Sequence, residues 1–187
     1  MTKIRTAAPT VLAVTLAEAK ASLRVDADIT DMDDLVTMWA KGVIADAEHL
    51  TGQRLMEQTW EVRLPCFPEA ISLPHPVLTI QSVAYIDAAG ADQVLAAPAY
   101  RLNRAAYAST LTPARGTSWP ATAEDDAAVV VTLQCGHGNT PAATPDNFRL
   151  YILAKLAEQF DPATRMERNT VQSTYLDGLL DACCCYA

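Results

Sequence analysis

The chain has 187 residues, of which 50% are hydrophobic, and its formal net charge at pH 7 is −8. This length can bury a core without disulfides, and five cysteines, three of them consecutive at Cys183, Cys184 and Cys185, do not form a paired framework. The negative charge argues against a general grip on nucleic acid. The sequence shows neither a signal-peptide pattern nor an apolar run of membrane-spanning length, so we expect a soluble protein.

The N-terminal part predicts an extended arm followed by a short helix. Residues 1–14 contain Pro9 and show no periodicity. Thr15 and Glu18 have the spacing of a capping box, in which each side chain accepts a hydrogen bond from the other residue's backbone. A first helix therefore follows Thr15, and its apolar stripe consists of Leu16, Ala19 and Leu23.

A second, longer helix is expected to end at Gly52, because glycine adopts the left-handed conformation that terminates helices. Thr30 with Asp33 can cap its start. Seven acidic residues and one basic residue lie from Asp26 to Glu48, which fits either a solvated face or a surface that repels DNA or attracts a basic partner. The predicted buried face consists of Leu35, Met38, Trp39, Val43 and Leu50.

An antiparallel β subdomain is predicted over residues 58–140. From Gln58 the apolar period changes from helical spacing to alternation, and prolines prevent a helix from resuming. Val129–Val131 are apolar without alternation, which indicates a strand covered on both faces. The strand candidates are residues 59–64, 70–73, 78–86, a short piece around Val94, 100–103 and 129–134.

Residues 141–162 are expected to contain a closing helix. The helix begins at Thr144, with Pro145 at its first position. The remaining residues, 163–187, form a tail with apolar side chains at helical spacing. Such a tail suits docking in a groove of a partner, or packing on its own domain. Its apolar positions are Tyr175, Leu176, Leu179, Leu180 and Cys183.

Motifs for catalysis or metal binding are weak. Asp26, Asp28 and Thr30 imitate the start of a calcium loop, but that loop's glycine and its final glutamate are both missing. Cys135 and His137 lack a CxxC partner for zinc. No nucleophile motif accompanies the three histidines, so the sequence predicts no enzyme, no metal site and no cofactor. Cys66 and Cys135 are expected to be buried.

The order of several segments nevertheless resembles one family. These segments are LAEAKASLRVD, the helix that contains Asp33 and Asp34, TGQRL, QTWEVRLPCFPEAISLPHPV, SVAYIDAAG, the SWP turn, VVVTLQCGHG and the closing helix. Over roughly residues 12–160 the chain resembles the head-tail connector, or adaptor, family of tailed bacteriophages and phage-like gene transfer agents. The loop Cys135-Gly-His-Gly and the triple cysteine depart from that pattern.

The resemblance implies an α+β fold in which two N-terminal helices (residues 1–57 with the arm) and the closing helix form a ring-building module with an inserted β subdomain. It implies a homo-oligomeric ring, a dodecamer in this family, in the neck of a particle assembled in the bacterial cytoplasm. The ring's partners would be the portal protein and a downstream connector, stopper or tail protein. DNA would pass through the ring without sequence-specific binding, and the ring would not bind a membrane. The tail would contact the portal through Tyr175, Leu176, Leu179 and Leu180.

Two further expectations accompany this interpretation. Asp31, Asp33 and Asp34 could face the channel, where negative charge keeps DNA sliding. The alternative function is a small β-rich module that binds a ligand or peptide without catalysis, supported by Trp119 beside Pro120 in an exposed-looking turn.

Overall fold

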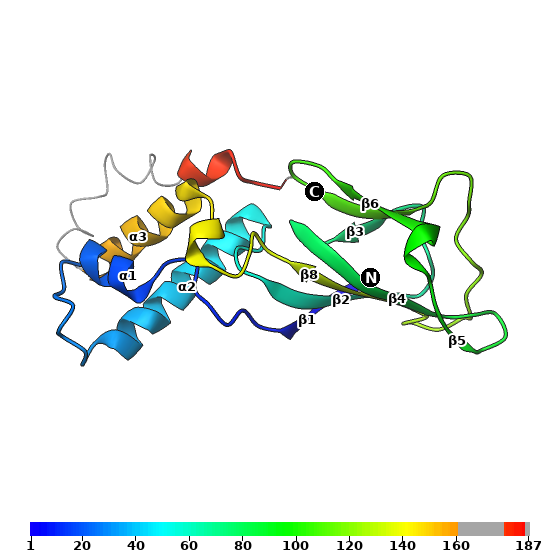
Figure 1. Ribbon diagram of the computed structural model, residues 1–187, viewed down its shortest axis with the longest axis horizontal. Helices are drawn as coiled ribbons and strands as arrows, with labels where there is room; N and C mark the ends of the chain where they lie inside the picture. The colour runs from blue at the N-terminus through cyan, green and yellow to red at the C-terminus, as the bar shows by residue number, and fades with distance from the viewer. Residues whose placement is uncertain (161–177, 186–187) are drawn as a thin grey trace. The chain divides into compact units, whose positions relative to one another are not determined.

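The computed structural model describes residues 1–160 and 178–185 (Figure 1). The chain divides into two compact units. The β unit consists of Met1–Ala8 and Glu57–Gly136, and the helical unit consists of Pro9–Met56 and the described residues between His137 and Cys185. The fold is therefore mixed, with helices and antiparallel sheets segregated, as the sequence predicted.

In the described part of the helical unit, three helices contact one another in all three pairs. The Thr15 hydroxyl accepts a hydrogen bond from the Glu18 backbone at 3.1 Å, and the Glu18 carboxylate accepts one from the Thr15 backbone at 2.8 Å, which confirms the capping box. The elements are α1 (Leu16–Ser22), α2 (Asp33–Thr51), the 3₁₀ turn η2 (Pro141–Ala143) and α3 (Asp146–Phe160), followed by a helical turn at residues 178–181.

The two ends of α2 differ in how well the sequence predicted them. Gly52 ends the helix with φ of 71°, the left-handed conformation expected there. The expected cap at Thr30 is wrong, because Met32 occupies the cap position and makes no side-chain cap bond. Asp33 instead lies in the first turn, where the positive end of the helix dipole favours a carboxylate.

The buried face of α2 also differs from the prediction. Leu35, Met38 and Leu50 are 37%, 60% and 54% exposed, so these three assignments to the core are wrong. The core of the helical unit is filled from α3 by Phe148 and Tyr151, and against such large side chains α2 packs its smaller ones. The buried apolar residues of α2 are Val36, Ala40, Val43, Ile44 and Ala47.

The β unit consists of two antiparallel sheets with a shared apolar core. One sheet has the strand order β1-β2-β8-β4-β5 and the other β3-β7-β6. Their bounds are β1 (Thr2–Ala7), β2 (Gln58–Leu64), β3 (Ile71–Leu73), β4 (Val77–Ile86), β5 (Asp92–Val94), β6 (Tyr100–Arg104), β7 (Ser109–Pro113) and β8 (Val129–Cys135), with a 3₁₀ turn η1 at Ala97–Ala99. The sequence missed β7.

The central strand β8 alternates between buried and half-buried residues, so the expectation that Val129–Val131 is covered on both faces is wrong. Val130 is only half buried because this antiparallel sheet buries one face in the core between the sheets. Cys135 at the strand end is buried, as predicted, whereas Cys66 is exposed.

The N-terminal residues are not a separate arm. They form β1, which pairs with β2 from Thr2 opposite Arg63 to Ala7 opposite Thr59. Met1–Ala8 therefore belong to the β unit rather than with the first two helices. Backbone pairing along β2 holds this strand although all six of its residues are exposed, which is why apolar periodicity gave no signal.

Candidate functional site

Catalytic chemistry finds little support in the arrangement of the histidines. His75 Nδ1 lies 2.9 Å from Ser109 Oγ, but Ser109 is only 2% exposed, so its hydroxyl is out of reach of a substrate. Burial lowers the pKa of His75, and a hydrogen bond with the Ala106 backbone opposes that shift. His137 Nε2 lies 3.0 Å from Gln53 Oε1, which is a structural link between two loops of the helical unit.

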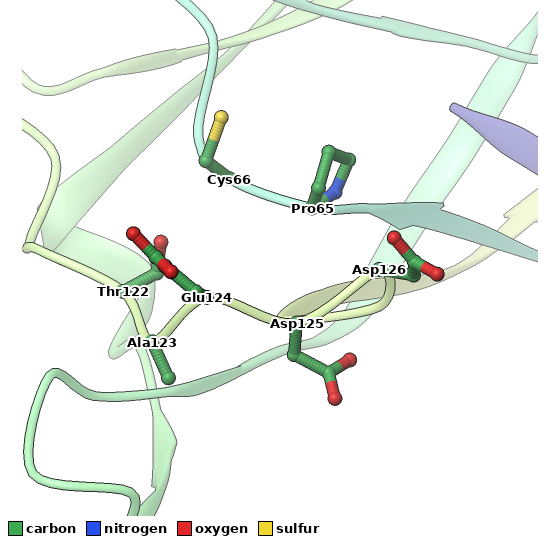
Figure 2. Close-up of a pocket in the computed structure, with 7 residues that line it drawn as sticks. All are labelled: Pro65, Cys66, Thr122, Ala123, Glu124, Asp125 and Asp126. Atoms are coloured by element: carbon green, nitrogen blue, oxygen red, sulfur yellow. The ribbon is translucent and has the colours of Figure 1, made fainter.

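An acidic hollow lies on the β unit between residues 65–66 and 122–126 (Figure 2). Figure 2 shows the Asp125 and Asp126 carboxylates pointing in different directions, and Asp125 accepts a hydrogen bond from the Ala127 backbone at 2.7 Å. The carboxylates therefore do not converge on a common point. Across the described residues 1–160 and 178–185, no group of three or more His, Cys, Asp or Glu side chains could hold a metal ion.

The three acidic residues predicted to face a channel have different environments. Asp31 and Asp34 are exposed. Asp33 is partly buried, and its Oδ1 lies 2.6 Å from Nζ of Lys20, a lysine that is only 5% exposed. The negative surface at the start of α2 is thus carried by Asp31 and Asp34, while Asp33 balances a buried cation.

Glu48 likewise does not contribute to the acidic surface that the sequence suggested. It is 7% exposed, its Oε1 accepts a hydrogen bond from the Leu55 backbone at 2.8 Å, and its Oε2 pairs with Arg54 at 3.3 Å. This carboxylate fixes the loop after Gly52, so it is structural.

Residues 178–185, called the C-terminal segment below, pack on the helical unit of the same chain. Leu180 is 3% exposed within the helical core, and Leu179 packs against that core from its edge. Cys185 donates its backbone N–H to the Thr51 carbonyl at 2.7 Å. The other two predicted portal anchors, Tyr175 and Leu176, lie outside the described residues.

Gln53 organises this attachment, and sequence reasoning missed it. Its side-chain amide donates to the Cys183 carbonyl at 2.6 Å, and its Oε1 faces His137, so one residue links three chain segments. Gln53 is 6% exposed. A polar residue directly after a helix-ending glycine reads as an ordinary loop residue, and only the fold shows the distant segments it joins.

The tryptophan that supported the ligand-binding alternative is occupied by packing. Trp119 stacks on Phe67 with ring centroids 4.7 Å apart and an angle of 11° between the planes, and Phe67 meets Tyr85 edge-on at 5.7 Å. The three rings pack against the core of the β unit. Phe67 therefore covers one face of the Trp119 indole, and the side chain is half-buried against the core of the β unit rather than exposed as its turn suggested.

No helix within the described part of the chain has the length and hydropathy to cross a membrane.

Comparisons with known proteins give a consistent fold. No protein-family model matches the sequence, and no curated protein matches it. The chain is similar to a chain of the virion of a native gene transfer agent (GTA) particle, with a TM-score of 0.81 and 21% identity over 100% of this chain and 97% of that one.

Two neck chains are also similar. One comes from the neck of an empty GTA particle computed with C6 symmetry (TM-score 0.74, 22% identity, 86% of this chain and 84% of that one). The other comes from the neck of a native GTA particle computed with C12 symmetry (TM-score 0.68, 24% identity, 86% of this chain and 82% of that one). The chain therefore has the fold of proteins found in such particles.

Proposed function

We propose that this chain is a structural head-tail connector, or adaptor, of a phage or phage-like particle, and that it acts without catalysis. The observation that carries the proposal is the likeness to neck and virion chains of gene transfer agent particles over 86% to 100% of this chain. The polar side chains described above form structural links rather than a reaction centre, which fits a component that acts by assembling.

In this proposal several copies form a ring below the portal protein, and DNA passes through the ring toward a downstream connector, stopper or tail protein. The sixfold and twelvefold symmetry of the neck assemblies that contain similar chains supports a ring, with twelve copies as the number to test. A ring needs two different complementary patches on each copy, because each subunit meets its two neighbours through opposite sides.

Negative charge suits the lining of a channel for DNA, because it prevents the phosphates from binding. We assign this part to Asp31 and Asp34, which are exposed, with Asp33 contributing less because Lys20 balances it. In assembled rings, Asp31→Lys/Asp34→Lys should retain double-stranded DNA that the parent ring releases at low salt. Equal DNA binding by both rings would refute the assignment.

The tail, residues 163–187, is proposed to contact the portal. In the isolated subunit, Leu180 is buried in its own helical unit, so the contact requires either that Tyr175 and Leu176 bind the portal while Leu180 stays in place, or that the segment detaches. Deleting residues 170–187 should abolish portal binding. Undiminished binding by that deletion would refute the portal contact while leaving the ring proposal intact.

Native mass spectrometry and electron microscopy of the protein mixed with its cognate portal test the proposal as a whole. We expect ring-shaped particles that attach to one end of the portal. A protein that stays monomeric and has no affinity for the portal would overturn the proposed function.

A further inference from the structure

The outer face of α2 carries apolar and small side chains where a surface helix normally carries charge. Leu35 and Met38 are 37% and 60% exposed, and the next positions along the same face are also exposed. We call this face the outer stripe; it consists of Leu35, Met38, Gly42 and Ala45 and ends at the polar His49.

The spacing of the outer stripe is that of a helix-packing surface. Its positions follow one another at intervals of three, four, three and four residues, the spacing by which one helix packs along another. At a rise of 1.5 Å per residue the stripe is about 21 Å long. A Cβ added at Gly42 would meet nothing within 4 Å, so the middle of the stripe is open to close approach by another helix.

This face is distinct from the one that builds the helical unit. Val36, Ala40 and Val43 point into the core and are at most 3% exposed. The helix thus has two apolar faces, and the fold of the subunit covers one of them. Exposed apolar patches of this kind mark sites of interaction with another protein.

A second exposed apolar position lies on another helix of the same unit. Leu150 of α3 is 48% exposed. Charges of both signs border each position. Exposed Asp34 and Lys41 lie one turn before and one turn after Met38. Asp146, whose side chain is 96% exposed, lies one turn before Leu150 and pairs with Arg149 at 3.6 Å. Docking α2 of one copy on α3 of another would bring apolar surface against apolar surface and a lysine toward an aspartate.

We propose that the outer stripe of α2 packs against the Leu150 face of α3 in a second copy of this chain. This inference rests on the proposed function, and it names the two patches by which neighbouring copies would meet. A contact between two different patches does not close after two copies, so it propagates around a ring. One helix face is smaller than the roughly 800 Å² per partner of a stable pair, so isolated pairs should be weak and closed rings favoured.

Charge substitutions at exposed positions test the contact in the full-length protein. Met38→Glu and Leu150→Lys should each weaken ring formation about tenfold or more, because each buries a lone charge within the contact. Met38→Glu/Leu150→Lys in one chain should recover part of the loss, since every contact then pairs a glutamate with a lysine. Leu50→Glu is the matched control, being 54% exposed on the same helix but outside the stripe, and should assemble like the parent protein.

Native mass spectrometry across a concentration series measures assembly, and thermal denaturation confirms that each variant is folded. Rings formed equally well by Met38→Glu and the parent would overturn the inference and leave the proposed function standing. If Met38→Glu forms normal rings that no longer bind the portal, the stripe contacts the portal rather than a second copy, which also overturns the inference. A double variant no better than the worse single variant would exclude α3 as the counterpart. Failure of the parent protein to form any ring with its portal would instead refute the proposed function.

Discussion

Leu180 provides a direct test of how the C-terminal segment is held, because sequence and structure assign it different roles. The sequence suggested an anchor for a partner, whereas the structure buries it in the helical core with 3% exposure. Truncating a buried leucine to alanine costs about 2–5 kcal/mol, with the low end applying where the surroundings can relax or the segment can detach. We therefore expect Leu180→Ala to lower the free energy of unfolding of the helical unit by about 2 kcal/mol.

The hydrogen bonds that hold the same segment should open more often when Leu180 is truncated. The Gln53 side chain and the Thr51 carbonyl each bind the backbone of residues 183–185, at 2.6 and 2.7 Å. In Leu180→Ala the backbone amides of Cys183 and Cys185, which donate to the Leu180 and Thr51 carbonyls, should exchange with solvent faster, because opening of the segment becomes easier. Leu179→Ala is the control, since Leu179 is only partly buried and should cost clearly less.

Urea unfolding followed by circular dichroism, with hydrogen exchange of the C-terminal amides, measures both effects. If Leu180→Ala changes neither the unfolding midpoint nor the exchange rates of residues 183–185, the segment is not packed as the structure has it. The assignment of Leu180 to a partner alone would then be the better account. Equal effects of the two substitutions would also contradict the reasoning, because their burial differs.

Three further outcomes follow from the described residues. The backbone hydrogen bond from Thr15 lowers the pKa of Glu18; burial opposes this shift, and the Thr15 hydroxyl and Arg149 assist it. The ionised Glu18 carboxylate therefore stabilises the fold above its unfolded pKa of about 4.3, and this stabilisation disappears as the pH falls through the lower folded pKa. Thermal denaturation should show an advantage over Glu18→Gln at pH 7 that vanishes toward pH 3. Exposed Cys66 should react with a maleimide before buried Cys135, and peptide mapping that finds Cys135 labelled first would contradict the fold of the β unit. Gln53→Ala should speed exchange at the Cys185 amide without unfolding α2, because it removes the hydrogen bond to the Cys183 carbonyl.

Local signals in the sequence located most elements of the fold. The Thr15–Glu18 capping box and the glycine at position 52 define helix ends through backbone chemistry that depends on few neighbours, and both are confirmed. The alternation after Gln58 located β2 because its residues face a core on one side. Strand β1 has no such face, since it is held by pairing with residues 59–63, and its sequence gave no sign of it.

The environments of charged and polar groups were less predictable. Asp33 and Glu48 look alike in the sequence to the exposed Asp31 and Asp34, yet one balances Lys20 and the other holds the Leu55 backbone. Those partners are fixed by tertiary contacts rather than by spacing along one helix. An acidic surface inferred from sequence is therefore an upper limit, from which the fold removes carboxylates used for structure.

The incorrect core assignment on α2 has a physical explanation. Sequence periodicity identifies apolar faces, but it does not say what covers each of them. Leu35 and Met38 are larger than most of the residues that α2 buries, so a ranking by hydrophobic size places them inside. The structure covers the other face with α3 and leaves these two exposed. In the proposed assembly, one apolar face of α2 stabilises the subunit and the second remains for the next copy. On this view Val43→Ala should destabilise the isolated chain, whereas Met38→Glu should leave it folded and impair only assembly.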